Sequence, residues 1–251
     1  TQGSVAELEQ AVADSAAGEV GAAEMPNVFS SYADTAYSVQ KQGKLVDLTG
    51  YFTSDELSSY VPDYLDEGRF DGDDSLYLLP VAKSTEVTML DGTDWDPFAQ
   101  ATGATVDDLA TQEGIAATAK RYYEYTDALT PNVPDDGKAF YGRDSLSNYF
   151  IIGMRQMGVE LLAPGDDGKT AINADKDKIR RLWDNYYVPF VSGYFDAKGK
   201  FRSDDMKTGD IICYTGSTAS AAYFPDQVVD DDGTHQIGYQ IIMPPTFEGG
   251  N

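Results

Sequence analysis

Short helix signals alternate with short strand signals along the whole chain, and this alternation limits the possible folds more than any other feature. Helix signals, several of them opened by a capping box or closed by a glycine, fall at residues 5–17, 53–61, 145–157 and 174–188. Strand signals fall at residues 85–90, 159–162, 169–172, 210–214 and 236–243. Interleaving of this kind predicts an α/β protein in which helices flank the sheets.

The first part of the chain carries two further short apolar segments. Residues 26–29 and 44–48 are expected to be extended, and Asp34 is expected to cap the helix between them. The composition and the helix signals change after Leu90, which is therefore the expected boundary between two lobes.

The second part begins with a long helical region. Asp96 and Pro97 are interpreted as the cap and the first-turn proline of helices that continue to residue 129. Trp183 follows Ile179 and Leu182 on an apolar helical stripe, so it is expected in the core.

The net charge excludes several classes of partner. The chain has 18 Lys and Arg against 42 Asp and Glu, a formal charge of −24 in 251 residues. Sequence-independent binding to nucleic acid depends on basic side chains, and an anionic membrane surface would repel such a chain. We therefore expect no nucleic-acid partner. No apolar run reaches the roughly 18 residues that a membrane helix needs.

Catalytic and metal motifs are scarce. His235, the only histidine, lies in a polar turn, and Cys213, the only cysteine, lies in an apolar run where a small buried hydrophobic residue is the expected role. A zinc site built from His and Cys is not expected, and neither a catalytic group nor a cofactor is predicted. Acidic clusters at 71–74, 166–167 and 230–232 lie beside glycines and are interpreted as solvated turns and not as calcium sites. With 42 carboxylates, a paired-carboxylate glycoside hydrolase stays open as an alternative.

Aromatic residues are abundant, with 17 Tyr and 11 Phe, and several of them stand in loops beside polar residues. An aromatic ring can stack on the apolar face of a sugar, and a tyrosine hydroxyl can bond the sugar's edge. Most of these rings are expected to be ordinary core or surface residues, but the supply suits a neutral polar ligand.

Three segments in order along the chain carry a family resemblance. The first segment, residues 8–48, contains a helix followed by Pro26-Asn27-Val28-Phe29 and Gly43-Lys44-Leu45-Val46-Asp47-Leu48. The second segment, residues 70–85, leads into a strand. The third segment, residues 201–217, runs from Phe201 to a glycine turn. Residues 237–250 follow as a return strand. Together they resemble the extracellular solute-binding proteins of ABC importers, in the family that contains the maltose- and sugar-binding proteins.

The resemblance implies a two-lobe periplasmic-binding-protein-like fold with a partial first lobe at 1–90, a second lobe at 91–243 and the start of a second crossover at 244–251. It also implies a chain shortened at both ends relative to the family. The implied function is non-catalytic capture of an extracellular sugar or oligosaccharide, in a cleft between the lobes, for delivery to an ABC transporter permease. Family members work outside the cell or in the periplasm, and a lipid anchor on the full-length protein is implied. The alternatives are the hydrolase named above and a surface adhesion or scaffold module.

By motif position, the resemblance places the ligand groups on loops at strand ends, where α/β sheets generally bind ligands. The expected ligand-binding residues are Ser31, Tyr32, Asp34, Lys83, Ser84, Arg143, Asp144, Asn148, Tyr214, Thr215, Gly216 and Ser217.

Overall fold

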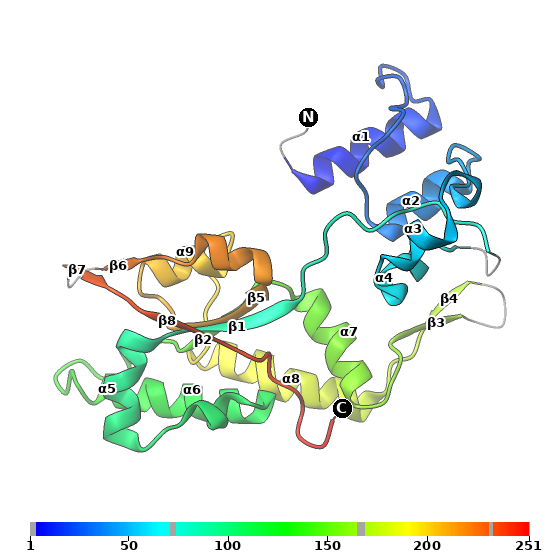
Figure 1. Cartoon of the computed structure of the whole chain (residues 1–251). Coiled ribbons are helices and arrows are strands. Elements are labelled where there is room, and N and C mark those ends of the chain that lie inside the picture. The colour runs from blue at the N-terminus through cyan, green and yellow to red at the C-terminus, as the bar shows by residue number, and fades with distance from the viewer. Residues whose placement is uncertain (1–3, 71–73, 165–168, 231–232, 251) are drawn as a thin grey trace. The chain divides into compact units, whose positions relative to one another are not determined.

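The chain forms two compact units. The computed structural model describes residues 4–70, 74–164, 169–230 and 233–250 (Figure 1). Unit 1 comprises Thr1–Lys83 and unit 2 comprises Ser84–Asn251. The division falls before the strand at residues 86–91 and not after it, because that strand is a central strand of the sheet in unit 2.

Helices are the regular secondary structure of the described part of unit 1, and irregular segments connect them. Its elements are α1 (Val5–Ala17), α2 (Ala33–Gln40), the 3-10 turn η1 (Thr49–Tyr51), α3 (Ser54–Ser58) and α4 (Pro62–Asp66). Ser4 caps α1 through the Glu7 amide, Gly18 ends that helix in the left-handed conformation, and Thr53 forms a capping box with Glu56, as the sequence predicts. A small core of Val12, Ala16 and Val39 joins α1 to α2.

Three expectations for unit 1 were wrong. Neither 26–29 nor 44–48 is a strand, since no strand among the described residues of unit 1 is present to pair with them and a lone strand leaves its backbone groups unpaired. Asp34 is not the cap of α2, because the helix begins two residues earlier than expected, with Tyr32 in the extended cap conformation and Asp34 in the first turn.

Unit 2 combines a mixed sheet with helices. Its strands are β1 (Glu86–Asp91), β2 (Tyr141–Arg143), β3 (Leu162–Pro164), β4 (Thr170–Ile172), β5 (Cys213–Ser217), β6 (Gln227–Asp230), β7 (Gly233–Gln236) and β8 (Tyr239–Ile242). Its helices are α5 (Gly92–Thr102), η2 (Val106–Leu109), α6 (Gln112–Asp127), α7 (Leu146–Gln156), α8 (Lys176–Val191), α9 (Arg202–Lys207) and η3 (Thr218–Tyr223).

The main sheet has the strand order β2-β5-β1-β8. β2 and β5 are parallel, whereas β1 runs antiparallel to both β5 and β8, with Glu86 opposite Ser217. The carboxyl ends of β2 and β5 and the start of β1 therefore meet at one edge of the sheet. β3 with β4 and β6 with β7 form two separate hairpins.

Consecutive strand residues enter two different cores. Leu90 and Cys213 pack with Trp95, Phe98 and other residues of the helical layer of α5 and α6. Met89 and Tyr214, their neighbours, pack on the opposite face with Met206 of α9. Figure 1 shows α5, α6 and α8 on one side of the sheet and α9 on the other. This alternation is the period-two pattern of a sheet covered on both faces, which confirms the predicted α/β class.

Two expectations for the helices of unit 2 were wrong. Helix α5 begins at Gly92 with Asp91 as its cap, so Pro97 lies inside the helix and not in its first turn. Trp183 is 47% exposed, because Leu182 takes the buried position of α8 and Trp183 turns outward to pack against Tyr187 at a ring separation of 3.9 Å.

Other sequence expectations are confirmed only in part. Cys213 is fully buried, and burial raises the pKa of its thiol. β5 begins later than expected and extends through Ser217. Within the described ranges, every helix is too short or too polar to span a bilayer. Parts of the acidic clusters, namely 71–73, 166–167 and 231–232, lie outside the described residues.

Candidate functional site

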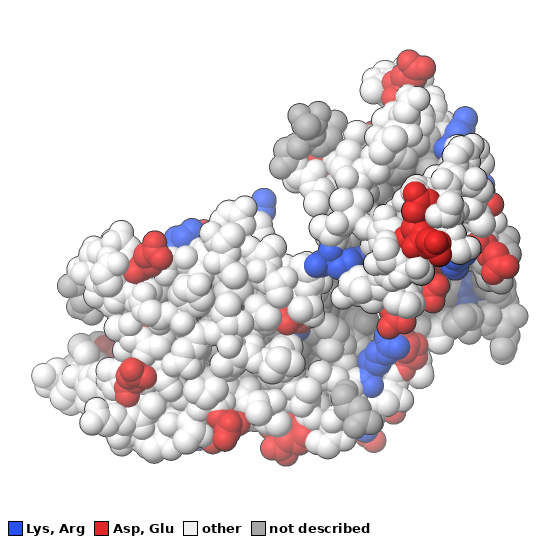
Figure 2. Space-filling model, in the orientation of Figure 1, with Lys and Arg blue, Asp and Glu red and all other residues white. Residues whose placement is uncertain are grey.

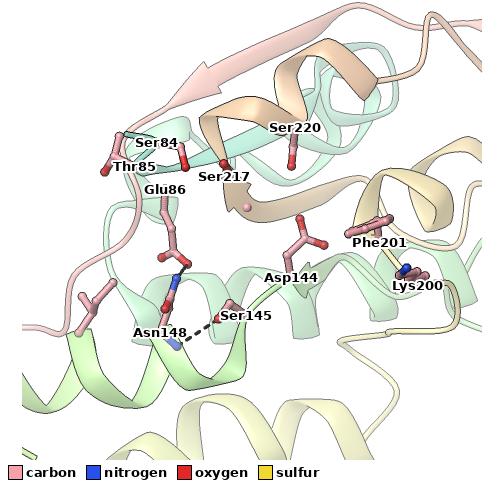
Figure 3. A pocket seen from close by; sticks show the side chains of 12 residues that line it. Ser84, Thr85, Glu86, Asp144, Ser145, Asn148, Lys200, Phe201, Ser217 and Ser220 are labelled. Atoms are coloured by element: carbon pink, nitrogen blue, oxygen red, sulfur yellow. Dashed lines mark hydrogen bonds between the residues drawn. The ribbon is translucent and has the colours of Figure 1, made fainter. Parts of the chain in front are cut away.

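A pocket of about 430 Å³ opens at the sheet edge where β2 and β5 end and β1 begins (Figure 3). Because the strands deliver loops to this edge, residues far apart in the chain share one cavity. Its lining residues are Ser84, Thr85, Glu86, Asp144, Ser145, Asn148, Ile152, Lys200, Phe201, Gly216, Ser217 and Ser220. All of them belong to unit 2.

Glu86 lies on one side of this pocket with two partners. Its carboxylate forms an ion pair with Arg143, and Oε1 accepts a hydrogen bond of 3.1 Å from Asn148 Nδ2. Arg143 is only 5% exposed, and its guanidinium lies 5.5 Å above the Tyr149 ring. The charge of Glu86 is therefore balanced inside the protein, and Asn148 is held facing the cavity.

Asp144 lies across the cavity and is balanced in the same way. Its Oδ1 accepts a hydrogen bond of 2.8 Å from the Arg202 backbone amide, and the Arg202 guanidinium Nε lies 3.9 Å away. Burial raises the pKa of Asp144, while the Arg202 contacts and a hydrogen bond to Ser220 act in the opposite direction. Gly216 faces this carboxylate, and a β-carbon at position 216 would collide with it.

Phe201 gives the pocket an apolar surface. Its side chain is 52% exposed although it lines the cavity, and Lys200 Nζ lies 5.4 Å from its ring centre. Figure 3 shows Phe201 beside Asp144, across the pocket from Glu86 and Asn148. An exposed ring opposite hydrogen-bonding groups can accept a ligand that has one apolar face and polar edges.

Two of the expected ligand residues are buried under this pocket and do not line it. Thr215 is fully buried, and its hydroxyl bonds Thr88 Oγ1 at 2.6 Å and the Tyr141 hydroxyl at 2.7 Å. Tyr214 is also buried, its hydroxyl has no hydrogen-bond partner among the described residues, and burial raises its pKa.

A second, smaller cavity of about 180 Å³ adjoins the first and shares Thr85, Glu86 and Ile152 with it. Arg143 lines this cavity together with Tyr149 and Pro245. The structure thus brings Ser84, Asp144, Asn148, Gly216 and Ser217 into the first pocket and Arg143 into the second.

The remaining expected residues belong to unit 1, which is described by itself. Tyr32 is 64% exposed, and Ser31 donates a hydrogen bond to the Tyr32 carbonyl oxygen at 2.7 Å. Asp34 accepts from the Thr35 amide at 2.8 Å. Lys83 forms an ion pair with Glu67 within the same unit.

Sequence reasoning missed Glu86, Lys200, Phe201 and the serines at 145 and 220. Phe201 opens the third family-like motif, and its position before a short helix was a usable signal. Glu86 gave no such signal, because only the folded sheet places it against Arg143 and Asn148, which lie 57 and 62 positions away.

Comparison with known proteins gives one finding. A family model described as bacterial extracellular solute-binding protein matches residues 1–250, and no curated protein matches the chain. The chain therefore belongs to the bacterial extracellular solute-binding protein family. Proteins of this family bind a small-molecule solute outside the cell membrane for ABC transport, and they are binding proteins and not enzymes.

Proposed function

We propose that the solute captured by this family member is a neutral sugar or oligosaccharide, and that the protein delivers it to an ABC transporter permease. The observation that carries the proposal is the exposed Phe201 ring in a pocket whose two carboxylates are already paired with arginines. A charged ligand would have to compete with those ion pairs, whereas a neutral ligand leaves them intact.

The hydrogen-bonding groups of the pocket suit hydroxyl groups. Asp144 and Glu86 offer carboxylate oxygens as acceptors, and Asn148 and the serines at 145, 217 and 220 offer groups that can donate or accept. Sugar hydroxyls also both donate and accept, so they can satisfy such a mixture, while Phe201 stacks on the C–H face of the ring.

The surface charge of unit 2 supports capture of a neutral solute. Figure 2 shows acidic side chains dispersed over the visible face of this unit and separated by wide uncharged areas. A dispersed negative charge keeps an exported protein soluble without creating one strong field that would select cations.

Isothermal titration calorimetry with a panel of mono- and oligosaccharides tests the proposal. We expect saturable binding of at least one sugar, and a loss of roughly 1–2 kcal/mol in binding free energy for Phe201→Ala because stacking area is lost. Trp183→Ala is the matched control, since Trp183 is a similarly exposed aromatic residue on α8 that lines neither the pocket of Phe201 nor the adjoining cavity.

The same incubations distinguish the alternatives. If chromatography detected cleaved glycan, the proposal would be wrong and the hydrolase would be favoured. Glu86 and Asp144 would then be the first carboxylates to substitute. Absence of both binding and cleavage would favour an adhesion or scaffold module. Tyr32→Ala and Lys83→Ala test the unit 1 residues that we continue to propose as ligand contacts.

A further inference from the structure

A second group of side chains gathers at the opposite end of β1. Asp91 is the last residue of β1, and Asp94 lies in the first turn of α5. His235 lies on β7, opposite Val228 of β6, and not in the polar turn that its neighbours in the sequence suggested. One potential ligand atom from each of the three lies within 4.8 Å of the others. His235 Nε2 is 3.2 Å from Asp94 Oδ1 and 3.4 Å from Asp94 Oδ2.

Only one oxygen of Asp91 has a structural role. Its Oδ1 caps α5 by accepting hydrogen bonds from the amides of Thr93 at 2.8 Å and Asp94 at 3.3 Å. Its Oδ2 is buried and has no hydrogen-bond partner among the described residues, and the whole residue is inaccessible to solvent. An unpartnered carboxylate oxygen in such a place is costly, and buried charges are normally paired or bound to a metal. The helix cap therefore explains the position of Oδ1 but not the burial of Oδ2.

Among the ion pairs of the described residues, no lysine or arginine contacts Asp91 or Asp94, and His235 is the one basic side chain that does. A bound cation would relieve the repulsion between the two carboxylates.

The donor set selects the kind of cation. Two carboxylate oxygens and one imidazole nitrogen suit zinc and related transition-metal ions, whereas magnesium and calcium prefer oxygen ligands alone. Ligand atoms about 2.1 Å from a tetrahedral zinc ion lie about 3.4 Å from one another, close to the separation of His235 Nε2 from Asp94. Asp94 and His235 line an open pocket of about 650 Å³, which gives an ion access from solvent.

We propose that Asp91, Asp94 and His235 form a binding site for a divalent transition-metal ion of the zinc class. This site is separate from the pocket at the start of β1, shares no lining residue with it, and does not depend on the identity of the captured solute. The sequence did not suggest it, because the two aspartates and the histidine are about 140 positions apart in the chain.

The single histidine provides a direct test. In the full chain labelled with nitrogen-15 histidine and freed of metal with a chelator, all imidazole signals belong to His235. We expect one equivalent of zinc chloride at neutral pH to shift these signals, with a dissociation constant in the micromolar range or below. Asp94→Asn and Asp91→Asn should each weaken binding by about 100-fold.

The controls separate the site from adventitious binding to an acidic protein. Asp91→Asn keeps the helix cap, since Asn and Asp cap helices about equally well, so its loss of zinc would not reflect unfolding. Asp136→Asn removes a carboxylate from the same pocket outside the cluster and should bind zinc like the unaltered chain. Unshifted His235 signals, or equal zinc affinity in Asp94→Asn, would overturn the site, and displacement of zinc by millimolar magnesium would overturn its metal class.

Discussion

The buried hydroxyl of Thr215 provides a test of whether that residue stabilises the fold or contacts the ligand. Thr215 is fully buried beneath the proposed ligand pocket, and it bonds the hydroxyls of Thr88 and Tyr141. Thr215→Val keeps the shape of the side chain but removes both hydrogen bonds. Each lost bond costs about 1 kcal/mol, and leaving the Tyr141 O–H buried and unpaired costs a further 1–2 kcal/mol, so unit 2 should lose about 3–4 kcal/mol of stability.

Urea unfolding followed by tryptophan fluorescence measures this loss in the right unit. Both tryptophans of the chain, Trp95 and Trp183, lie in unit 2, so the signal reports that unit alone. Thr170→Val is the matched control, because Thr170 lies on the exposed strand β4, and a change within about 0.5 kcal/mol is expected there.

A second substitution, Tyr141→Phe, should change the stability in opposite directions in the unaltered chain and in Thr215→Val. Tyr141→Phe in the Thr215→Val background removes the hydroxyl that the first change left without a partner. The double variant should therefore be more stable than Thr215→Val by about 1 kcal/mol, although Tyr141→Phe alone destabilises the protein. Additive losses would refute the hydrogen-bond explanation, and a loss of sugar affinity at unchanged stability would show that Thr215 acts on the ligand instead.

Three further predictions concern the pocket and the core. Gly216→Ala should destabilise the protein by about 1–3 kcal/mol and weaken sugar binding in calorimetry, because its methyl group would meet the Asp144 carboxylate, whereas Gly50→Ala has open space and should change little. Because the pKa of Asp144 is raised, its favourable contribution to folding is complete below about pH 4 and is lost as the pH rises through the raised pKa. In urea unfolding, the stability of Asp144→Asn relative to the unaltered chain should therefore increase from pH 4 to pH 7. A stability difference that does not change with pH would contradict the raised pKa. Cys213 should react with a thiol reagent about 100-fold more slowly in the folded protein than in urea, as measured by absorbance, because the thiol is buried and its pKa is raised.

Local signals in the sequence predicted local structure well. The capping residues Ser4 and Thr53 and the stop at Gly18 act through neighbours within a few positions, so they could be recognised without knowledge of the fold. Strand β1 could be predicted for the same reason, because its signal lies in the strand's own residues.

Expectations failed where the outcome depended on a distant partner. Residues 26–29 have strand composition but no partner strand among the described residues of unit 1. Trp183 and Leu182 are both apolar neighbours on α8, and only packing decides which of them faces the core.

For a related reason, only part of the lining of the proposed ligand pocket could be expected from the sequence. Motif order placed Asp144, Asn148 and Ser217 at strand ends, and the fold brings those ends together. Glu86 and Phe201 were missed as ligand residues because their roles depend on a charge partner and on exposure, which neither spacing nor composition encodes.

Strand β1 has a mechanical consequence for both proposed sites. It begins at Glu86 in the proposed ligand pocket and ends at Asp91 in the proposed metal site, and it is hydrogen-bonded on both sides by β5 and β8. A slip of one residue would exchange Met89 and Leu90 between the two cores, so the strand cannot slide along its axis. The strand is roughly 17 Å long from end to end. Its fixed length keeps the two proposed sites at a constant separation, whether or not a solute or a metal ion is bound.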